Sequence, residues 1–251
     1  MPTDRPLCSD TGAYGSQPRV LITAGPTHEP IDAVRYIANR SSGQMGIALA
    51  AEAVRRHWPV TLLLGPTPHK PPENSHLRSL RFQTTADLQQ LLREHWPSHD
   101  VLFMAAAVAD YTAEPPQSQQ KLKRSDQPLT LRLIPTPDLL ADLASMTRPH
   151  QTTIGFALEP AERLLESALG KLERKRLDAI VANPLETMDA PDITARVILR
   201  TGEIVTAPPR MPKGQFAAWL MDLVEPLVQR RRQGKDSAVL GQAPPDAEEK
   251  I

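Results

Sequence analysis

A short segment ahead of the first helical pattern combines residue types that bind anions. Arg35 offers a planar guanidinium and Asn39 a neutral amide, and Ser41, Ser42 and Gly43 open the helix. The first amides of a helix lack intrahelical partners and lie at the positive end of its dipole, so this combination suits a phosphate. The alternatives are a serine that only caps the helix, an asparagine in a turn and an arginine in a surface ion pair. The segment is neither a G-x-G-x-x-G fingerprint nor a Walker P-loop.

A second polar position follows a run of small residues. Ala106 and Ala107 continue an apolar run that leads to Asp110. Small side chains at the end of a buried strand leave room for a flat group against the backbone. Asp110 is then placed either to bind sugar hydroxyls or to act as a structural cap.

Three cations stand within a polar, proline-containing loop at residues 111–128. These are Lys121, Lys123 and Arg124. Such a run is usually a solvated surface, but a loop of this kind can also place a lysine over a triphosphate. In the second case the loop is expected to be mobile until a nucleotide binds.

Two further features lie later in the chain. Pro137 and Asp138 begin a helix that continues through Leu139 and Leu140, which is good capping chemistry and leaves free amides for a ligand. Lys171 and Lys175 follow at a four-residue spacing and so share one helix face. They are either two solvated charges or a pair of phosphate-binding cations.

The elements that must position these residues alternate between strand and helix. Apolar runs at residues 20–23, 60–64 and 101–108 predict strands, and the last is continuous, as in a strand buried on both faces. Helical patterns follow at residues 43–56 and 84–95. We therefore predict a doubly wound, mostly parallel Rossmann-like α/β sheet with helices on both faces. Ligands of such sheets bind beyond the carboxyl ends of the strands, where every group above lies.

The remaining pattern sets the domain limits. Residues 111–134 form an excursion from the sheet, with a strand expected at 129–133, and the last helix at residues 216–228 is expected to be interrupted by Pro226. Residues 1–17 and 233–251 are polar or lack periodicity, so we predict a disordered arm and a disordered tail around a domain at residues 18–232.

Composition excludes several classes of protein. Lys and Arg number 29 and so do Asp and Glu, so no basic field favours nucleic acid. The single cysteine, Cys8, excludes a disulfide framework and a cysteine zinc site within one chain. No apolar run approaches the roughly 20 residues of a membrane span, and no signal peptide is evident, which predicts a cytoplasmic protein with no membrane contact.

Several stretches together resemble the phosphopantothenate–cysteine ligase family. They occur in family order, and the ordered set is far more specific than any one of them. The stretches are LITAGPTHEPIDAVRYIANRSSGQMG, AAAVADY, KLKR, PTPDLL, IGFA and LDAIVAN, between Leu21 and Asn183.

The resemblance implies a two-step ligation in coenzyme A biosynthesis. A nucleoside triphosphate, with Mg²⁺, converts the carboxylate of 4'-phosphopantothenate into an acyl-nucleotide and releases pyrophosphate. The amine of cysteine then displaces the nucleoside monophosphate. CTP is the expected co-substrate, with ATP as the alternative, and the metal ligands are not predicted.

The resemblance also implies residue roles. Asn39, Arg35 and Ala107 resemble positions that handle the acyl-nucleotide, and Lys121 resembles the lysine needed to form it, with Lys123 as a substitute. The positions that resemble the nucleotide site, together with the phosphate-suited helix start, are Ser41, Ser42, Gly43, Ala106, Asp110, Pro137, Asp138, Leu139, Leu140, Phe156, Lys171 and Lys175. The chain departs from the family at Leu158-Glu159-Pro160 and at Asn183-Pro184, near the expected site.

The family context sets expectations about partners. Few residues precede the first strand, so we predict a ligase without flavin whose decarboxylase is a separate chain. A homodimer with the site near the interface is expected. The rival readings are a dinucleotide-dependent oxidoreductase, which lacks its glycine fingerprint here, and a binding protein that has lost the chemistry, against which Asn39 and Lys121 argue.

Overall fold

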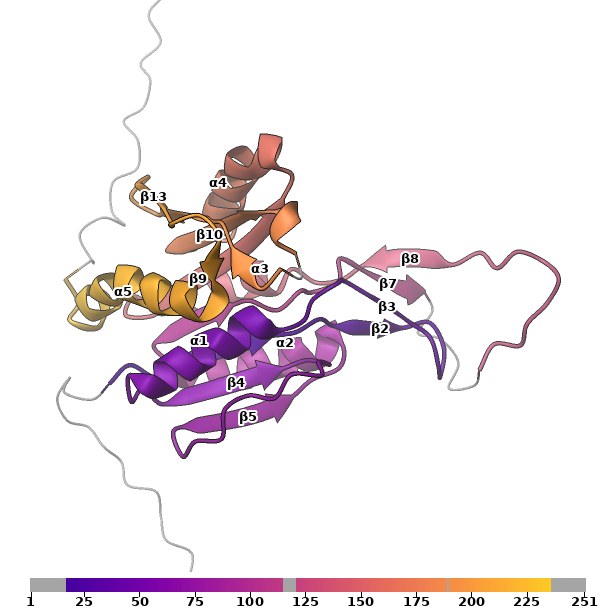
Figure 1. The fold of residues 1–251 in the computed structure, drawn as a ribbon. Coiled ribbons are helices and arrows are strands. Elements are labelled where there is room, and N and C mark those ends of the chain that lie inside the picture. The colour runs from indigo at the N-terminus through magenta and orange to yellow at the C-terminus, as the bar shows by residue number, and fades with distance from the viewer. Residues whose placement is uncertain (1–16, 115–120, 189, 236–251) are drawn as a thin grey trace, which may run out of the picture.

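An eight-stranded sheet forms the centre of the molecule (Figure 1). The computed structural model describes residues 17–114, 121–188 and 190–235. Six strands run parallel; at one edge β12 pairs antiparallel with β10, and β13 pairs antiparallel with β12. In spatial order they are β13 (Ile204–Thr206), β12 (Arg196–Leu199), β10 (Ala179–Pro184), β9 (Thr152–Glu159), β6 (Val101–Met104), β1 (Val20–Ala24), β4 (Val60–Leu64) and β5 (Leu77–Arg81). The predicted mostly parallel α/β fold is confirmed.

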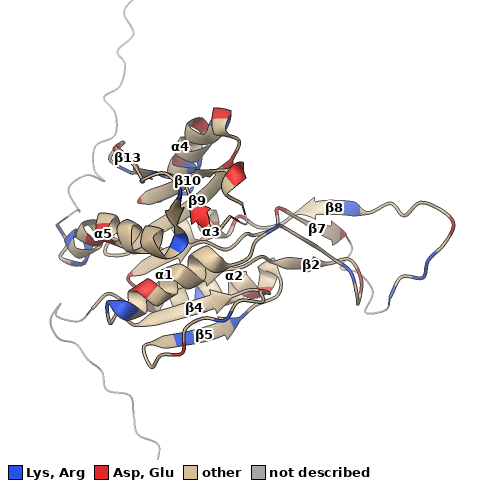
Figure 2. Cartoon of the chain, in the orientation of Figure 1, with Lys and Arg blue, Asp and Glu red and all other residues tan. Residues whose placement is uncertain are grey.

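Helices cover both faces of this sheet. One face packs against α1 (Gln44–Arg55) and α5 (Lys213–Arg232), through a core that includes Ile22, Leu62, Val181 and Phe216. The opposite face carries α2 (Thr85–His95), α3 (Leu139–Ala144) and α4 (Leu164–Arg174). Every residue of β1, β4 and β6 is buried, as expected of strands covered on both sides. The distribution of charge agrees with this burial. In Figure 2 the buried strand β4 is tan throughout, whereas the edge strand β5 carries blue bands that mark Lys or Arg.

Local sequence signals explain where two of these helices begin. Thr84 and Asp87 form a reciprocal capping box at α2: the Thr84 hydroxyl accepts from the Asp87 amide at 3.1 Å, and the Asp87 carboxylate accepts from the Thr84 amide at 2.9 Å. At α3 the Asp138 carboxylate accepts from the Ala141 amide at 3.2 Å. The capping chemistry predicted at Asp138 is confirmed.

The last helix corrects one prediction. Helix α5 continues through Pro226 and is not interrupted there. A proline inside a helix removes one backbone hydrogen bond, which favours a break. Here Phe216, Leu220, Val224 and Val228 are fully buried along one stripe of the helix, and this packing outweighs the local penalty.

Two ribbons project from one side of the sheet (Figure 1). Strands β2 (His28–Pro30) and β3 (Tyr36–Ala38) form the first, and β7 (Tyr111–Glu114) and β8 (Arg132–Pro135) form the second. The predicted loop at residues 111–128 is therefore wrong at its start, and the strand expected at 129–133 begins later. No apolar alternation marks β7, because this short strand pairs with β8 in a two-stranded ribbon that has no fully covered face.

Short elements complete the described chain. A third ribbon pairs β11 (Asp192–Ile193) with β14 (Met211–Pro212) and leads directly into α5. The 3-10 turns are η1 (Trp96–Ser98), η2 (Ala161–Arg163) and η3 (Leu185–Thr187). Most of the predicted arm at 1–17 and tail at 233–251 lies outside the described residues. Within the described ranges, no helix is both long and apolar enough to cross a membrane.

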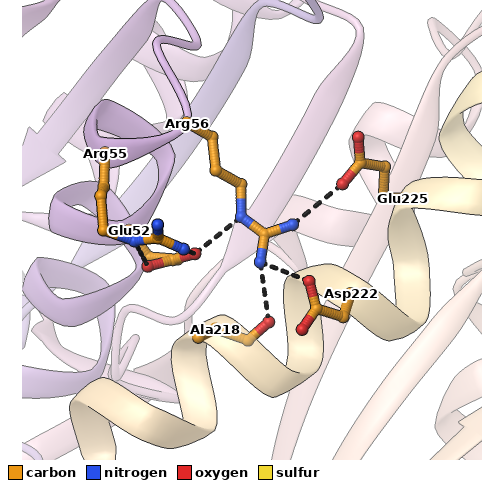
Figure 3. A network of polar contacts seen from close by, with 6 residues as sticks. All are labelled: Glu52, Arg55, Arg56, Ala218, Asp222 and Glu225. Atoms are coloured by element: carbon orange, nitrogen blue, oxygen red, sulfur yellow. Dashed lines mark hydrogen bonds and ion pairs between the residues drawn. The ribbon is translucent and has the colours of Figure 1, made fainter.

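A charged network joins the two helices on one face (Figure 3). The Arg56 guanidinium donates to Glu52 at 2.7 Å, to Asp222 at 2.6 Å, to Glu225 at 2.9 Å and to the carbonyl of Ala218 at 3.1 Å. The Arg56 side chain is 12% exposed, so these contacts are partly shielded from water and fix the end of α1 against α5. Hydrogen bonds from Arg55 outweigh burial and, together with Arg56, hold the pKa of Glu52 below its usual value.

Arg56→Met is expected to lower the free energy of unfolding by about 2 kcal/mol, because it leaves the buried Glu52 carboxylate with only the exposed Arg55 as partner and removes the contacts from Arg56 to α5. The matched control is Arg55→Met, which breaks a contact to the same Glu52 from a side chain that is 68% exposed, where solvent screens the pair. Chemical denaturation of both variants measures the difference. Equal losses would show that the network does not hold α1 against α5.

Candidate active site

A cavity of about 690 Å³ opens at the carboxyl ends of the parallel strands. It is lined by the segments that follow β3, β6 and β8 and by the ends of β9 and β10. The predicted site residues that line it are Asn39, Ser41, Ser42, Gly43, Ala106, Ala107, Asp110, Pro137, Asp138, Leu139, Leu140, Phe156, Lys171 and Lys175. The cavity therefore gathers groups that are up to 136 residues apart in the sequence, from position 39 to position 175.

The turns after β1 and β6 are tied together by backbone hydrogen bonds. The Ala107 amide donates to the Gly25 carbonyl at 3.0 Å, and the Thr27 amide donates to the Ala107 carbonyl at 3.2 Å. The side chains of two threonines add to this pairing: Thr23 accepts from the Ala106 amide at 3.0 Å, and Thr27 accepts from the Ala109 amide at 2.9 Å. One wall of the cavity is consequently rigid backbone with small side chains, as the alanine run predicts.

The turn that precedes α1 depends on two glycines. Gly43 has φ 73° and Gly25 has φ 83°, both in the left-handed region that favours glycine. A Cβ on Gly43 would lie 3.3 Å from the Gly25 backbone, so the two turns are also closely apposed. The Thr67 hydroxyl donates to the Ser42 carbonyl at 2.6 Å and holds the turn from the β4 side.

The serines do not cap the helix. The N-cap residue of α1 is Gly43, and no side chain accepts a capping hydrogen bond there. The Ser41 hydroxyl accepts only a long bond of 3.4 Å from the Gly43 amide. The simple alternative of an N-cap serine is therefore wrong, and both serines line the cavity instead.

Asn39 is held by the segment that follows β6. Its amide nitrogen donates to the Val108 carbonyl at 2.8 Å. Thr136 ties the same segment from the other side, because its hydroxyl donates to the Ala109 carbonyl at 2.6 Å and its amide donates to the Asp110 carbonyl at 2.9 Å. The segment that carries Asp110 is therefore held by Asn39 on one side and by Thr136 on the other.

Two lysines bring positive charge to the cavity. Lys171 pairs with Glu159 at 2.6 Å, and Lys175 pairs with Asp138 at 3.0 Å. The Lys171 ammonium holds the pKa of Glu159 below its usual value. Neither lysine is more than 29% exposed, so the alternative of two solvated charges is wrong. Their geometry suits an anionic ligand that would compete with, or add to, these carboxylates.

Arg35 and Lys121 do not line the cavity of their own chain. Instead the structure brings their segments together on the projecting ribbons. Arg35 donates to Asp32 and to the Leu122 carbonyl at 2.9 Å, and the Leu122 amide donates to Asp32 at 3.1 Å. Burial alone would raise the pKa of Asp32, but hydrogen bonds from the Arg35 guanidinium and from three backbone amides hold it well below its usual range.

Several lining residues were not predicted as site residues. Leu158 and Asn183 appear in the sequence only as departures from the family pattern. Thr187, Met188 and Ile193 follow β10, and Lys213 is the first residue of α5. No local motif marks them, because β10, the β11–β14 ribbon and α5 converge on the cavity only through tertiary packing.

The donors present set limits on a metal site. Across the described ranges, no group of three or more His, Cys, Asp or Glu side chains could hold a metal ion. Asp110 and Asp138 both line the cavity, and Asp138 also pairs with Lys175. A Mg²⁺ ion typically takes one or two carboxylates and completes its shell with water and substrate phosphates, so these residues fit an ion that arrives with a nucleotide.

Comparison with known proteins places the chain in a family. Residues 16–227 match the model of the DNA/pantothenate metabolism flavoprotein C-terminal domain. Two curated relatives are a cysteine/cysteine sulfinic acid decarboxylase from an unknown prokaryotic organism and the coenzyme A biosynthesis bifunctional protein CoaBC of Vibrio cholerae. They are 42% and 40% identical over 67% and 66% of this chain. The chain spans 46% and 41% of the lengths of these relatives.

The fold of a solved relative agrees with this assignment. The C-terminal domain of a coenzyme A biosynthesis bifunctional protein CoaBC is 32% identical, with a TM-score of 0.72 over 84% of this chain and 96% of that one. The chain therefore belongs to the DNA/pantothenate metabolism flavoprotein C-terminal domain family, which includes the phosphopantothenoylcysteine synthetase domain of CoaBC that its motifs resemble.

Proposed function

We propose that the protein ligates L-cysteine to 4'-phosphopantothenate at the expense of a nucleoside triphosphate, with CTP as the preferred co-substrate. One observation carries the proposal. A single cavity gathers an anion-suited turn at Ser41–Gly43, a carboxylate at Asp110, an aromatic side chain at Phe156 and two lysines. These are the groups needed to hold phosphates, a ribose and a base beside a second anionic substrate.

The chemistry follows from the weakness of a carboxylate as an electrophile. A carboxylate oxygen of phosphopantothenate attacks the α-phosphorus of the nucleotide, and pyrophosphate leaves. The cysteine amine then attacks the acyl carbon, and the nucleoside monophosphate leaves. Cations placed where charge develops stabilise such transition states, a role that we assign to Lys171 and Lys175. Mg²⁺ bound to the phosphates would supply further charge stabilisation.

We also propose a homodimer in which the projecting ribbons reach the second copy. Val34, Tyr36 and Tyr111 on these ribbons are 61%, 53% and 52% exposed, which is unusual for large apolar side chains gathered in one region. His28 stacks on Tyr36 with 3.8 Å between ring centroids, which adds a second aromatic ring to this surface. A second copy that covers it would bring Arg35 and Lys121 toward a cavity that they do not reach in their own chain.

Pyrophosphate release tests the function directly. The full chain would be incubated with 4'-phosphopantothenate, Mg²⁺ and each nucleoside triphosphate, with and without cysteine. Release that requires phosphopantothenate, and a peptide-bonded product that requires cysteine, are expected. Carbon dioxide release from cysteine without any nucleotide would instead favour the activity named for the decarboxylase relative and would overturn the proposal.

Asn39→Asp is expected to leave nucleotide activation largely intact but to impair the cysteine step. The substitution replaces a donor to the Val108 carbonyl with a carboxylate, which repels both that carbonyl and the acyl-nucleotide phosphate. The acyl-nucleotide should accumulate and be detected by mass spectrometry. The control is Asn74→Asp, where the exposed side chain only accepts a bond from the His76 amide. Full turnover by Asn39→Asp would refute the assigned role.

A further inference from the structure

The end of β10 carries an asparagine whose orientation is fixed by a hydroxyl. The Asn183 amide nitrogen donates to the Thr187 hydroxyl at 2.8 Å, and that hydroxyl donates to the Pro184 carbonyl at 2.7 Å. Asn183 and Thr187 both line the cavity and are both partly buried.

Only one assignment of hydrogen-bond donors and acceptors is possible for Asn183 and Thr187. The Pro184 carbonyl can only accept, so the single hydroxyl proton of Thr187 is committed to it. The Thr187 oxygen can then only accept, which requires the NH₂ group of Asn183 and not its carbonyl oxygen to face it. Among the described residues no group donates to the Oδ1 atom of Asn183, so this acceptor remains for a ligand.

The surroundings of this acceptor suit a flat, largely apolar group. Phe156 and Leu158 alternate along β9, and Leu158 lies in register with Asn183 on β10. Side chains at paired register positions and at alternate positions along a strand share one face of a sheet. Phe156, Leu158 and Asn183 therefore share one face at the carboxyl edge, and all three line the cavity.

We infer that Thr187 positions Asn183 so that its Oδ1 atom accepts a hydrogen bond from the exocyclic amino group of a nucleotide base, and that the site thereby selects amino-bearing over carbonyl-bearing bases. The inference rests on the proposed function, because it assumes that the cavity holds a nucleoside triphosphate. It assigns Asn183 to base recognition and Thr187 to the positioning of Asn183.

The inference predicts the relative affinities of four nucleotides. Cytosine presents an amino group where uracil presents a carbonyl, and adenine does so where hypoxanthine presents a carbonyl. A carbonyl facing the Asn183 oxygen would pair two acceptors, which leaves both unsatisfied and repels the base. CTP should therefore bind better than UTP, and ATP better than ITP, by at least about tenfold.

The test measures binding and turnover of the full chain with the same four nucleotides. Calorimetry gives each dissociation constant without reliance on turnover, and pyrophosphate release gives kcat/KM. Thr187→Val removes the hydroxyl with little change of shape and frees the Asn183 amide to turn its NH₂ group to the ligand. The CTP-to-UTP ratio should then fall about tenfold, chiefly through better binding of UTP. Thr187→Ser keeps the hydroxyl and should restore the ratio.

A distant threonine provides the matched control. Thr206→Val changes an exposed residue on the edge strand β13 and should leave the ratio as in the unaltered protein. Equal loss of CTP and UTP in Thr187→Val would show a merely structural role and would overturn the inference. Equal binding of CTP and UTP by the unaltered protein would overturn it, together with the proposed preference for CTP, while leaving the proposed ligation reaction standing. Binding of none of the four nucleotides would overturn both.

Discussion

Gly46→Ala is expected to lower the free energy of unfolding by about 3 kcal/mol, the upper end of typical overpacking effects. A Cβ at this position would lie 2.4 Å from the Ala24 Cβ, 2.8 Å from the Thr23 carbonyl oxygen and 3.1 Å from the Ala24 Cα. These atoms belong to β1, a fully buried central strand that cannot yield, so α1 must move away from the sheet. The displacement would also shift the Ser41–Gly43 turn and weaken nucleotide binding.

A second helical glycine gives a control of opposite sign. Gly170 lies on an exposed position of α4, and a Cβ there would meet nothing within 4 Å. Gly170→Ala should stabilise the protein by about 0.5–1 kcal/mol, because alanine loses less backbone entropy in a helix than glycine. Denaturant unfolding of the two variants measures both effects. Two stabilising substitutions would show that α1 and β1 are not packed as closely as described.

The sequence predicts the sheet well because its strands are buried on both faces. The runs at 20–23 and 60–64 contain no charged residue and coincide with β1 and β4. Prediction from local sequence patterns fails where tertiary contacts determine the local structure. Pro226 suggests a break that the buried stripe of α5 prevents, and β7 is a strand without an apolar pattern because it belongs to an exposed ribbon.

The residues of the candidate site show the same difference between local sequence signals and tertiary contacts. Residues 39–43, which line the cavity, can be singled out from the sequence because they stand next to one another in one motif. No motif marks Thr187, because the role that we propose for it depends on one hydroxyl proton donated to a carbonyl three residues earlier. Arg35 and Lys121 were singled out by resemblance, yet only the structure shows that their segments meet at Leu122 and away from the cavity of the same chain.

Lys121→Gln is expected to slow pyrophosphate release by about 10²–10³-fold, the range seen when a single electrostatic donor is removed from a transition state. The lysine is exposed, but its neighbour Leu122 is held by Asp32 and Arg35, so its backbone is anchored. Lys123→Gln is the matched control, because it removes an equal charge from the other side of the same anchor. If the Lys123→Gln variant is inactive and the Lys121→Gln variant is active in pyrophosphate release, Lys123 and not Lys121 stabilises the transition state.

A mixture of two variants that are impaired in overall ligation then decides which copy supplies the lysine, with activity measured as formation of the cysteine-ligated product. If Lys121 acts on the cavity of a partner, a mixed dimer of Lys121→Gln and Asn39→Asp contains one site with both residues intact. Random reassociation should therefore restore roughly a quarter of the normal activity, since half of the dimers are mixed and each has one sound site. If Lys121 acts within its own chain, every site of every dimer carries one defect. Activity would then stay at the level of the separate variants, and the role proposed for the projecting ribbons would be wrong.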